Sequence, residues 1–180
     1  VREDLQDTMQ KGSRISIAAA CFSIYAYQES KKQLEDIAEL RFIFTSPTFV
    51  QENTPKEQRE FYIPKLTREK SLYGTEFEVR LRNELTQKAL AKECADRVRR
   101  KVKFRSNVSG EQMPGFMTVG ESSYMPISGF TTVDLGCERG NNAYYPVQRT
   151  EAFENGRYFL SLFDEIWNDS SRLQDVTDIV

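Results

Sequence analysis

Residues 15–44 have the sequence ISIAAACFSIYAYQESKKQLEDIAELRFIF, and this stretch decides the fold class. Its apolar runs at 15–20 and 40–44 predict two buried strands, and the polar residues between about 26 and 34 predict a helix. A strand, a helix and a second strand within about thirty residues form a βαβ unit, in which the strands are parallel. The sequence therefore predicts an α/β domain, a mixed β-sheet flanked by helices.

Apolar spacing predicts further elements on both sides of this unit. Helices are expected over 1–11, 87–100 and 158–167, and short strands over 101–104, 114–119 and 124–127. The polar segment at about 50–73 carries two prolines and is expected to be an irregular insertion within one domain, 1–180. Because the chain starts with Val and stops without a tail, we expect a fragment of a longer protein. The residues expected in the central sheet are Ile15, Ile17, Ile43, Val119 and Ile127.

Composition excludes several function classes. The 180 residues include no histidine, which rules out imidazole as nucleophile, proton shuttle or metal ligand for this chain acting alone. Cys21, Cys94 and Cys137 lie far apart without CxxC spacing, so neither a disulfide framework nor a zinc site is predicted. An odd number of cysteines indicates a reducing cytoplasm. The longest apolar stretch, 15–24, is too short to span a bilayer, so no membrane association is expected.

Positive charge is concentrated in one half of the chain. Residues 56–105 contain 15 basic and 8 acidic residues, although the net charge of the whole chain is −2. Six cations at the end of a predicted helix and along the next strand would neutralise phosphates without reading bases, so we expect weak, non-specific nucleic-acid binding. The same pattern is also typical of a solvated helix end. These six residues are Arg97, Arg99, Arg100, Lys101, Lys103 and Arg105.

Three segments together resemble the phospholipase D-like domain. The first is a strand of small residues followed by Cys21-Phe22-Ser23, the second is 113–117 (MPGFM), and the third is 128–135 (SGFTTVDL). In that family a catalytic strand carries His-x-Lys, an Asp follows, and a Ser-Asn-Phe-Thr-x-x-Gly-Leu turn comes next. The closing stretch 163–169 (FDEIWND) resembles the end of such domains where they precede a bacterial helicase motor.

This sequence departs from the family pattern at the positions of the residues that carry out the family's chemistry. Pro114 stands at the position of the nucleophilic His, Phe116 at that of the phosphate-binding Lys, Glu121 near that of the Asp, and Gly129 at that of the Asn. Proline and phenylalanine supply neither a nucleophile nor a cation, so the resemblance implies a fold that has lost catalysis and filled its old site as core. No cofactor is expected in this fragment, and ATP and Mg²⁺ only in a downstream motor domain.

The resemblance implies an accessory domain of a DNA or RNA helicase, with the covalently linked motor as partner and a binding or regulatory role with nucleic acid. One alternative is a nuclease domain of a restriction or mobile-element system, for which Asp134, Glu138 and 76–80 (EFEVR) would have to converge on metal ions. The other is a protein-interaction or homodimerisation module, since single-motif members of the family dimerise. Its interface candidates are Tyr144, Tyr145 and Phe153, for which the favoured alternative is packing in the core.

Overall fold

The computed structural model describes residues 2–47, 92–96, 100–138, 146–151, 155–178 and 180. Its helices are α1 (Arg2–Thr8), α2 (Ile24–Glu29), α3 (Lys31–Asp36) and α7 (Asn155–Asn168), and residues 92–96 and 100–101 are helical as well. Its strands are β1 (Arg14–Ala19), β2 (Glu39–Phe44), β3 (Val102–Asn107), β4 (Phe116–Val119), β5 (Ser122–Met125), β6 (Gln148–Thr150) and β7 (Leu173–Asp175). The predicted insertion at 50–73 lies outside the described residues.

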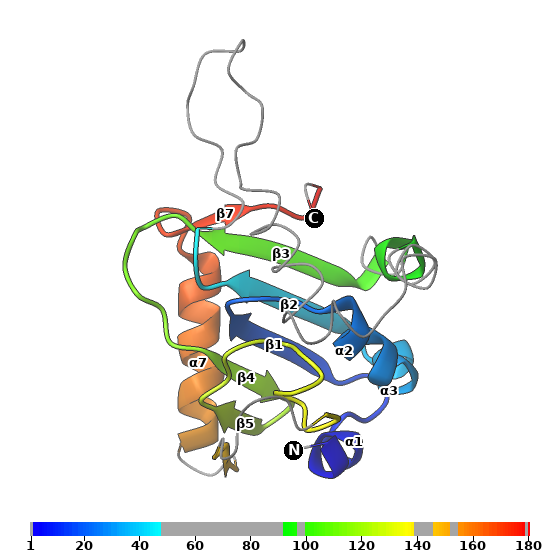
Figure 1. The fold of residues 1–180 in the computed structure, drawn as a ribbon. Helices are drawn as coiled ribbons and strands as arrows, with labels where there is room; N and C mark the ends of the chain where they lie inside the picture. The colour runs from blue at the N-terminus through cyan, green and yellow to red at the C-terminus, as the bar shows by residue number, and fades with distance from the viewer. Residues whose placement is uncertain (1, 48–91, 97–99, 139–145, 152–154, 179) are drawn as a thin grey trace.

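The strands form one mixed sheet, with the order β6-β5-β4-β1-β2-β3-β7 (Figure 1). β1, β2 and β3 are mutually parallel, and the remaining strands are added antiparallel on both sides. The predicted α/β class with a mixed sheet is therefore confirmed. β1 is the strand at which the direction of the sheet changes, because it pairs with parallel β2 on one side and with antiparallel β4 on the other.

Two short helices, and not the single predicted one, connect β1 to β2. Ser23 caps α2, since its Oγ accepts hydrogen bonds from the backbone N–H groups of Tyr25 (3.2 Å) and Ala26 (3.4 Å). Ser30 ends α2 and also precedes α3. The Ser30 side chain makes no capping hydrogen bond, and the break is marked by the non-helical backbone of this residue (φ −98°, ψ 7°).

The sheet separates two apolar layers. Alternate residues of each strand point to opposite faces, so Ile15 and Ile17 pack with the helices α1, α2 and α3, whereas Ala18 and Ile43 pack under α7. Figure 1 shows α7 on one side of the sheet and α2 and α3 on the other. Phe22 joins the first layer to the loop beyond β5, because its ring lies 5.3 Å from those of Phe104 and Phe130.

Two details of the sheet differ from the prediction. Ile15, Ile17, Ile43 and Val119 lie in strands as expected, but Ile127 follows the end of β5 and is buried in the loop. The three-residue strands β6 and β7 were not predicted, because so short a segment has no measurable periodicity.

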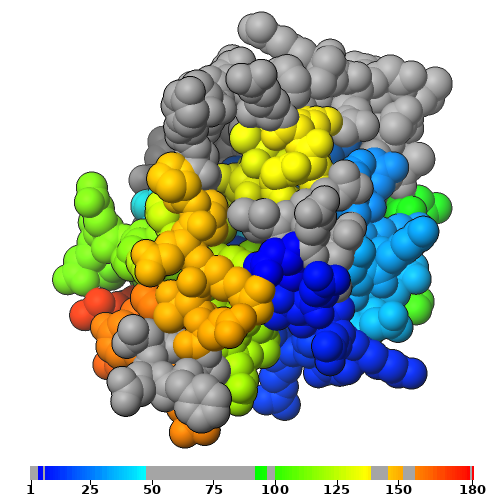
Figure 2. All heavy atoms as spheres, turned by 90° about the horizontal axis from the view of Figure 1, so that it is seen from below, coloured from blue at the N-terminus to red at the C-terminus, as the bar shows by residue number. Residues whose placement is uncertain are grey.

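β6 lies beside the N-terminal helix, and Arg149 forms an ion pair with Asp4 of α1. In Figure 2 the dark blue start of the chain accordingly lies against the gold residues near 150. None of the helices in the described ranges combines the length and apolar composition needed to cross a membrane.

Candidate functional site at the carboxyl end of β1

The sheet brings two of the segments singled out in the sequence to one edge. Because β4 runs antiparallel to β1, its first residue Phe116 pairs with Ala18 near the end of β1. The loop after β5 lies alongside, since Ala20 N–H donates to the Ser128 carbonyl (2.9 Å) and Phe130 N–H donates to the Cys21 carbonyl (2.9 Å). The segments 113–117 and 128–135 therefore meet where β1 ends, which is also where ligands bind in open α/β sheets.

Gly115 allows this close approach. The Ile127 N–H donates to the Gly115 carbonyl (2.9 Å), and a Cβ at position 115 would lie 1.8 Å from the Ile127 carbonyl oxygen. The Ala18 carbonyl oxygen would lie 3.4 Å from the same Cβ. Only glycine fits between these two backbones.

Phe116 occupies the position at which the family resemblance places a phosphate-binding lysine. Its side chain is fully buried, and its ring centroid lies 5.8 Å from that of Phe159 and 6.1 Å from that of Phe163, both on α7. Phe116 is thus part of the apolar layer, as expected of a filled site. Pro114 is exposed, so the same expectation is wrong for Pro114.

Glu121 lies away from Phe116 and does not form a common site with Pro114 and Phe116. It is exposed in the turn that follows β4, whereas Phe116 begins that strand. A four-residue strand is about 13 Å long, so the two positions lie at opposite ends of β4.

The carboxylates of the 128–138 loop are engaged within the loop itself. Thr131 Oγ1 donates to Asp134 Oδ2 (2.6 Å) and accepts from the Asp134 N–H (3.0 Å), while Thr132 Oγ1 donates to Glu138 Oε2 (2.9 Å). Both threonines are buried. The described residues contain no cluster of three or more His, Cys, Asp or Glu side chains able to hold a metal ion. Residues 76–80 of the nuclease hypothesis lie outside the described ranges.

Gly129 leaves no room for the asparagine that the resemblance would place there. A Cβ at this position would lie 2.6 Å from Cys21 Sγ, 2.9 Å from Thr131 Cγ2 and 3.1 Å from Asp134 Oδ2. The space at the end of β1 is thus filled by contacts among Cys21, Gly129 and Asp134.

Cys94 is a buried thiol outside this loop. Burial, and secondarily the Glu93 carboxylate, raises the pKa of its thiol to about 12. Cys94 therefore stays protonated at neutral pH.

The predicted basic cluster is divided between different environments. Arg97 and Arg99 lie outside the described residues, and Arg100 is exposed. Lys101 Nζ donates to the backbone carbonyls of Glu35 (2.7 Å) and Ile37 (3.0 Å), at the end of α3.

The two cations on β3 lie on the α7 side of the sheet. Lys103 is exposed and its ammonium lies 3.1 Å from a carboxylate oxygen of Glu39. Arg105 is half-buried: its guanidinium lies 4.7 Å from the centroid of the Trp167 ring and donates to the Trp167 carbonyl. Among the described cations of the cluster, Arg100 and Lys103 are therefore the two best placed to meet a phosphate.

Arg41 is a polar residue that sequence reasoning missed. One of its terminal nitrogens lies 2.7 Å from Asp164 Oδ1, and the other donates to Ser16 Oγ (3.0 Å). Its guanidinium carbon also lies 5.0 Å from the centroid of the Phe163 ring. The signal was a single charge within the apolar run 40–44, which indicates a partner on a facing element.

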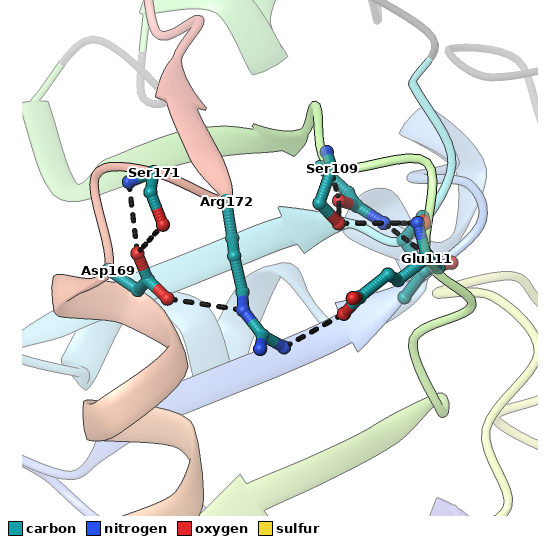
Figure 3. Close-up of polar contacts among 7 residues, drawn as sticks. Ser109, Glu111, Asp169, Ser171 and Arg172 are labelled. Atoms are coloured by element: carbon teal, nitrogen blue, oxygen red, sulfur yellow. Dashed lines mark hydrogen bonds and ion pairs between the residues drawn. The ribbon is translucent and has the colours of Figure 1, made fainter.

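A polar cluster ties the β3–β4 loop to the turn between α7 and β7. Arg172 bridges Glu111 (Nη1 to Oε2, 3.1 Å) and Asp169 (Nε to Oδ2, 3.2 Å), as Figure 3 shows. Ser171 donates to Asp169 Oδ1 through its hydroxyl (2.5 Å) and its backbone N–H (2.9 Å). These bonds fix the two loops beside the carboxyl end of β3.

The pKa of Asp169 is lowered, first by the hydrogen bond from the Ser171 hydroxyl and further by the Ser171 backbone and Arg172. Because the folded pKa lies below the unfolded one, this carboxylate stabilises the fold above its unfolded pKa, and that contribution is lost as the pH falls through the folded pKa. Ser171→Ala should raise the pKa of Asp169 toward its ordinary value, measured by NMR titration of the side-chain carboxyl carbon.

Ser109→Ala is the matched control, because the Ser109 hydroxyl donates its hydrogen bond to Asn107 Oδ1 (2.8 Å) and not to Asp169. It should leave the Asp169 titration unchanged. Superimposable titration curves for Ser171→Ala and the parent protein would contradict the assignment.

Comparisons with protein-family models, with curated protein sequences and with solved structures give no match for this chain.

Proposed function

We propose that this chain is a non-catalytic accessory domain, phospholipase D-like in origin, that binds the phosphate backbone of nucleic acid for a helicase motor in the same polypeptide. The observation that carries the proposal is Phe116, which is sealed between the sheet and α7 at the position where the resemblance requires a cation. The three segments that carry the resemblance include two that lie together at the carboxyl end of β1.

The chemistry of the chain supports a role in binding over one in catalysis. No histidine is present to act as nucleophile or general acid. The hydroxyls of Thr131 and Thr132 are already engaged with Asp134 and Glu138. ATP hydrolysis and Mg²⁺ would belong to the motor and have no counterpart in the proposed role of this domain.

The exposed cations support weak contact with the backbone. Arg100 and Lys103 are exposed, and Arg97 and Arg99 belong to the same stretch of sequence. Few phosphates would be neutralised, and the net charge of −2 opposes binding at long range. We expect a dissociation constant of about 10⁻⁴–10⁻⁶ M for DNA of any sequence, with a strong dependence on salt.

The test is DNA binding by the 180-residue chain over a range of salt concentrations. Replacing Arg97, Arg99 and Arg100 by Ala should flatten the plot of log K against log salt by about three units at most, because each phosphate contact contributes about one. The matched control replaces the three exposed cations Lys11, Arg14 and Lys32 by Ala and should keep the parent slope.

Three outcomes would overturn the proposal. One is the absence of DNA binding at about 50 mM salt, where backbone contacts are strongest. The second is equal binding by the triple variant and the parent. The third is DNA hydrolysis by the pure chain, which would instead favour the nuclease function.

A protein-interaction module is the second candidate, favoured by the engagement of the predicted cations with the protein itself. Lys101 is bound to α3, Lys103 lies beside Glu39, and Arg105 lies on Trp167. The interface residues expected from the sequence, Tyr144, Tyr145 and Phe153, lie outside the described ranges. A concentration-dependent dimer without DNA affinity, detected by analytical ultracentrifugation, would support this second function.

A further inference from the structure

An apolar cavity of about 270 Å³ lies on the face of the sheet covered by α2 and α3. Its floor is formed by Leu40 and Val102, which are paired in register near the starts of β2 and β3. This is the end of the parallel strands opposite to the edge that holds Cys21 and Phe116. The apolar lining residues are Phe22, Tyr27, Leu34, Ile37, Leu40 and Val102.

The cavity is partly open to solvent, and it is much larger than the voids that packing leaves inside proteins. Protein interiors contain few voids larger than a water molecule. An apolar cavity of about 150 Å³ is sufficient to bind benzene. A volume of about 270 Å³ therefore has room for one ring with a short substituent, or for a chain of several methylene groups.

Two cations stand beside this apolar space. Lys101 and Arg100 both contribute to its wall, and both side chains belong to exposed residues. Lys101 Nζ uses two of its three N–H donors on the carbonyls of Glu35 and Ile37. Arg100 forms no ion pair with another residue of the described ranges, and its guanidinium carries five N–H donors. A negative group placed here would gain charge-assisted hydrogen bonds.

We propose that this cavity binds a small anionic amphiphile, an aliphatic or aromatic carboxylate whose apolar part fills the cavity and whose carboxylate meets Arg100. The apolar lining selects the body of the ligand, and the adjacent cation selects its charge. This site shares Arg100 with the proposed contact with nucleic acid, but it differs in its occupant, a free small molecule whose apolar part lies against α2 and α3.

The test uses octanoate as the probe and calorimetric titration of the 180-residue chain. Octanoate should bind saturably, one molecule per chain, and methyl NMR shifts should be confined to the lining residues Leu34, Ile37, Leu40 and Val102. Arg100→Gln should weaken octanoate binding about tenfold or more, because it removes a charge-assisted hydrogen bond, and should leave 1-octanol binding unchanged. Arg100 is exposed, so this variant should fold as the parent does.

Lys103→Gln is the matched control, since it removes one exposed cation from the opposite face of the sheet, and it should bind octanoate as the parent does. Leu34→Phe should reduce the affinity for octanoate and for 1-octanol together by filling the cavity.

The proposal would be overturned by any of three results. These are no saturable binding at millimolar octanoate, an equal loss of affinity in Arg100→Gln and Lys103→Gln, or equal binding of octanoate and octylammonium. A dimer abolished by Arg100→Gln, with no octanoate binding, would assign the cavity to a second copy of the chain and would also overturn it. None of these results depends on DNA binding, so this proposal and the proposed function fail separately.

Discussion

Replacing Phe116 by alanine should lower the free energy of unfolding by about 3–5 kcal/mol, measured by urea denaturation. The ring is fully buried between the sheet and α7, where it contacts Phe159 and Phe163. Its removal leaves a cavity that backbone atoms of β4 cannot fill, because that strand is held by β1 and β5 on its two sides.

Tyr158→Ala is the control for this experiment, because Tyr158 is an aromatic residue of the same helix that is 61% exposed. It should change the stability by no more than about 0.5 kcal/mol. A loss below about 1 kcal/mol for Phe116→Ala would show that position 116 is not part of the core.

The double change Pro114→His and Phe116→Lys should not restore phosphodiester hydrolysis, since the new lysine would be buried among aromatic rings and Pro114 is exposed.

The parts of the fold that the sequence predicted are those with long apolar periodicity. The runs at 15–20 and 40–44 became β1 and β2, paired in parallel as the intervening helical segment required. Apolar residues at 159, 162, 163 and 166 predicted α7, which the structure places over Phe116. In each case the apolar pattern and the burial that it predicts belong to a single chain segment. The sequence of that segment is therefore sufficient to predict the strand or helix.

The arrangement of the basic cluster could not be predicted, because it depends on which face of the sheet each residue meets. Alternation along β3 puts Lys103 and Arg105 on the α7 side, with Phe104 on the other. Whether a cation then faces solvent or an aromatic ring depends on α7, some sixty residues away: Trp167 covers Arg105 and leaves Lys103 exposed.

The cavity beside Arg100 could not be predicted from the sequence either. Its walls come from α2, α3 and the starts of β2 and β3, and the apolar residues of each element are those expected of an ordinary core. An unfilled space between elements is a property of their packing and leaves no pattern in any one of them.

Within the segment 113–117, Pro114 and Phe116 carry the family resemblance. The residue between them, however, determines how the end of β1 is joined to the loop after β5.

Gly115 is that residue, and Gly115→Ala should destabilise the domain by about 3 kcal/mol or more, measured by urea denaturation. The added Cβ would lie 1.8 Å from the Ile127 carbonyl oxygen, so two backbone segments must separate and the hydrogen bond from Ile127 N–H to the Gly115 carbonyl must lengthen. Gly110→Ala is the control: its φ is +72° and its Cβ would meet nothing within 4 Å, so it should cost only the backbone strain of about 1–2 kcal/mol. Equal losses for the two variants would mean that the loop after β5 moves aside freely, and that the edge where β1 ends is not a fixed junction.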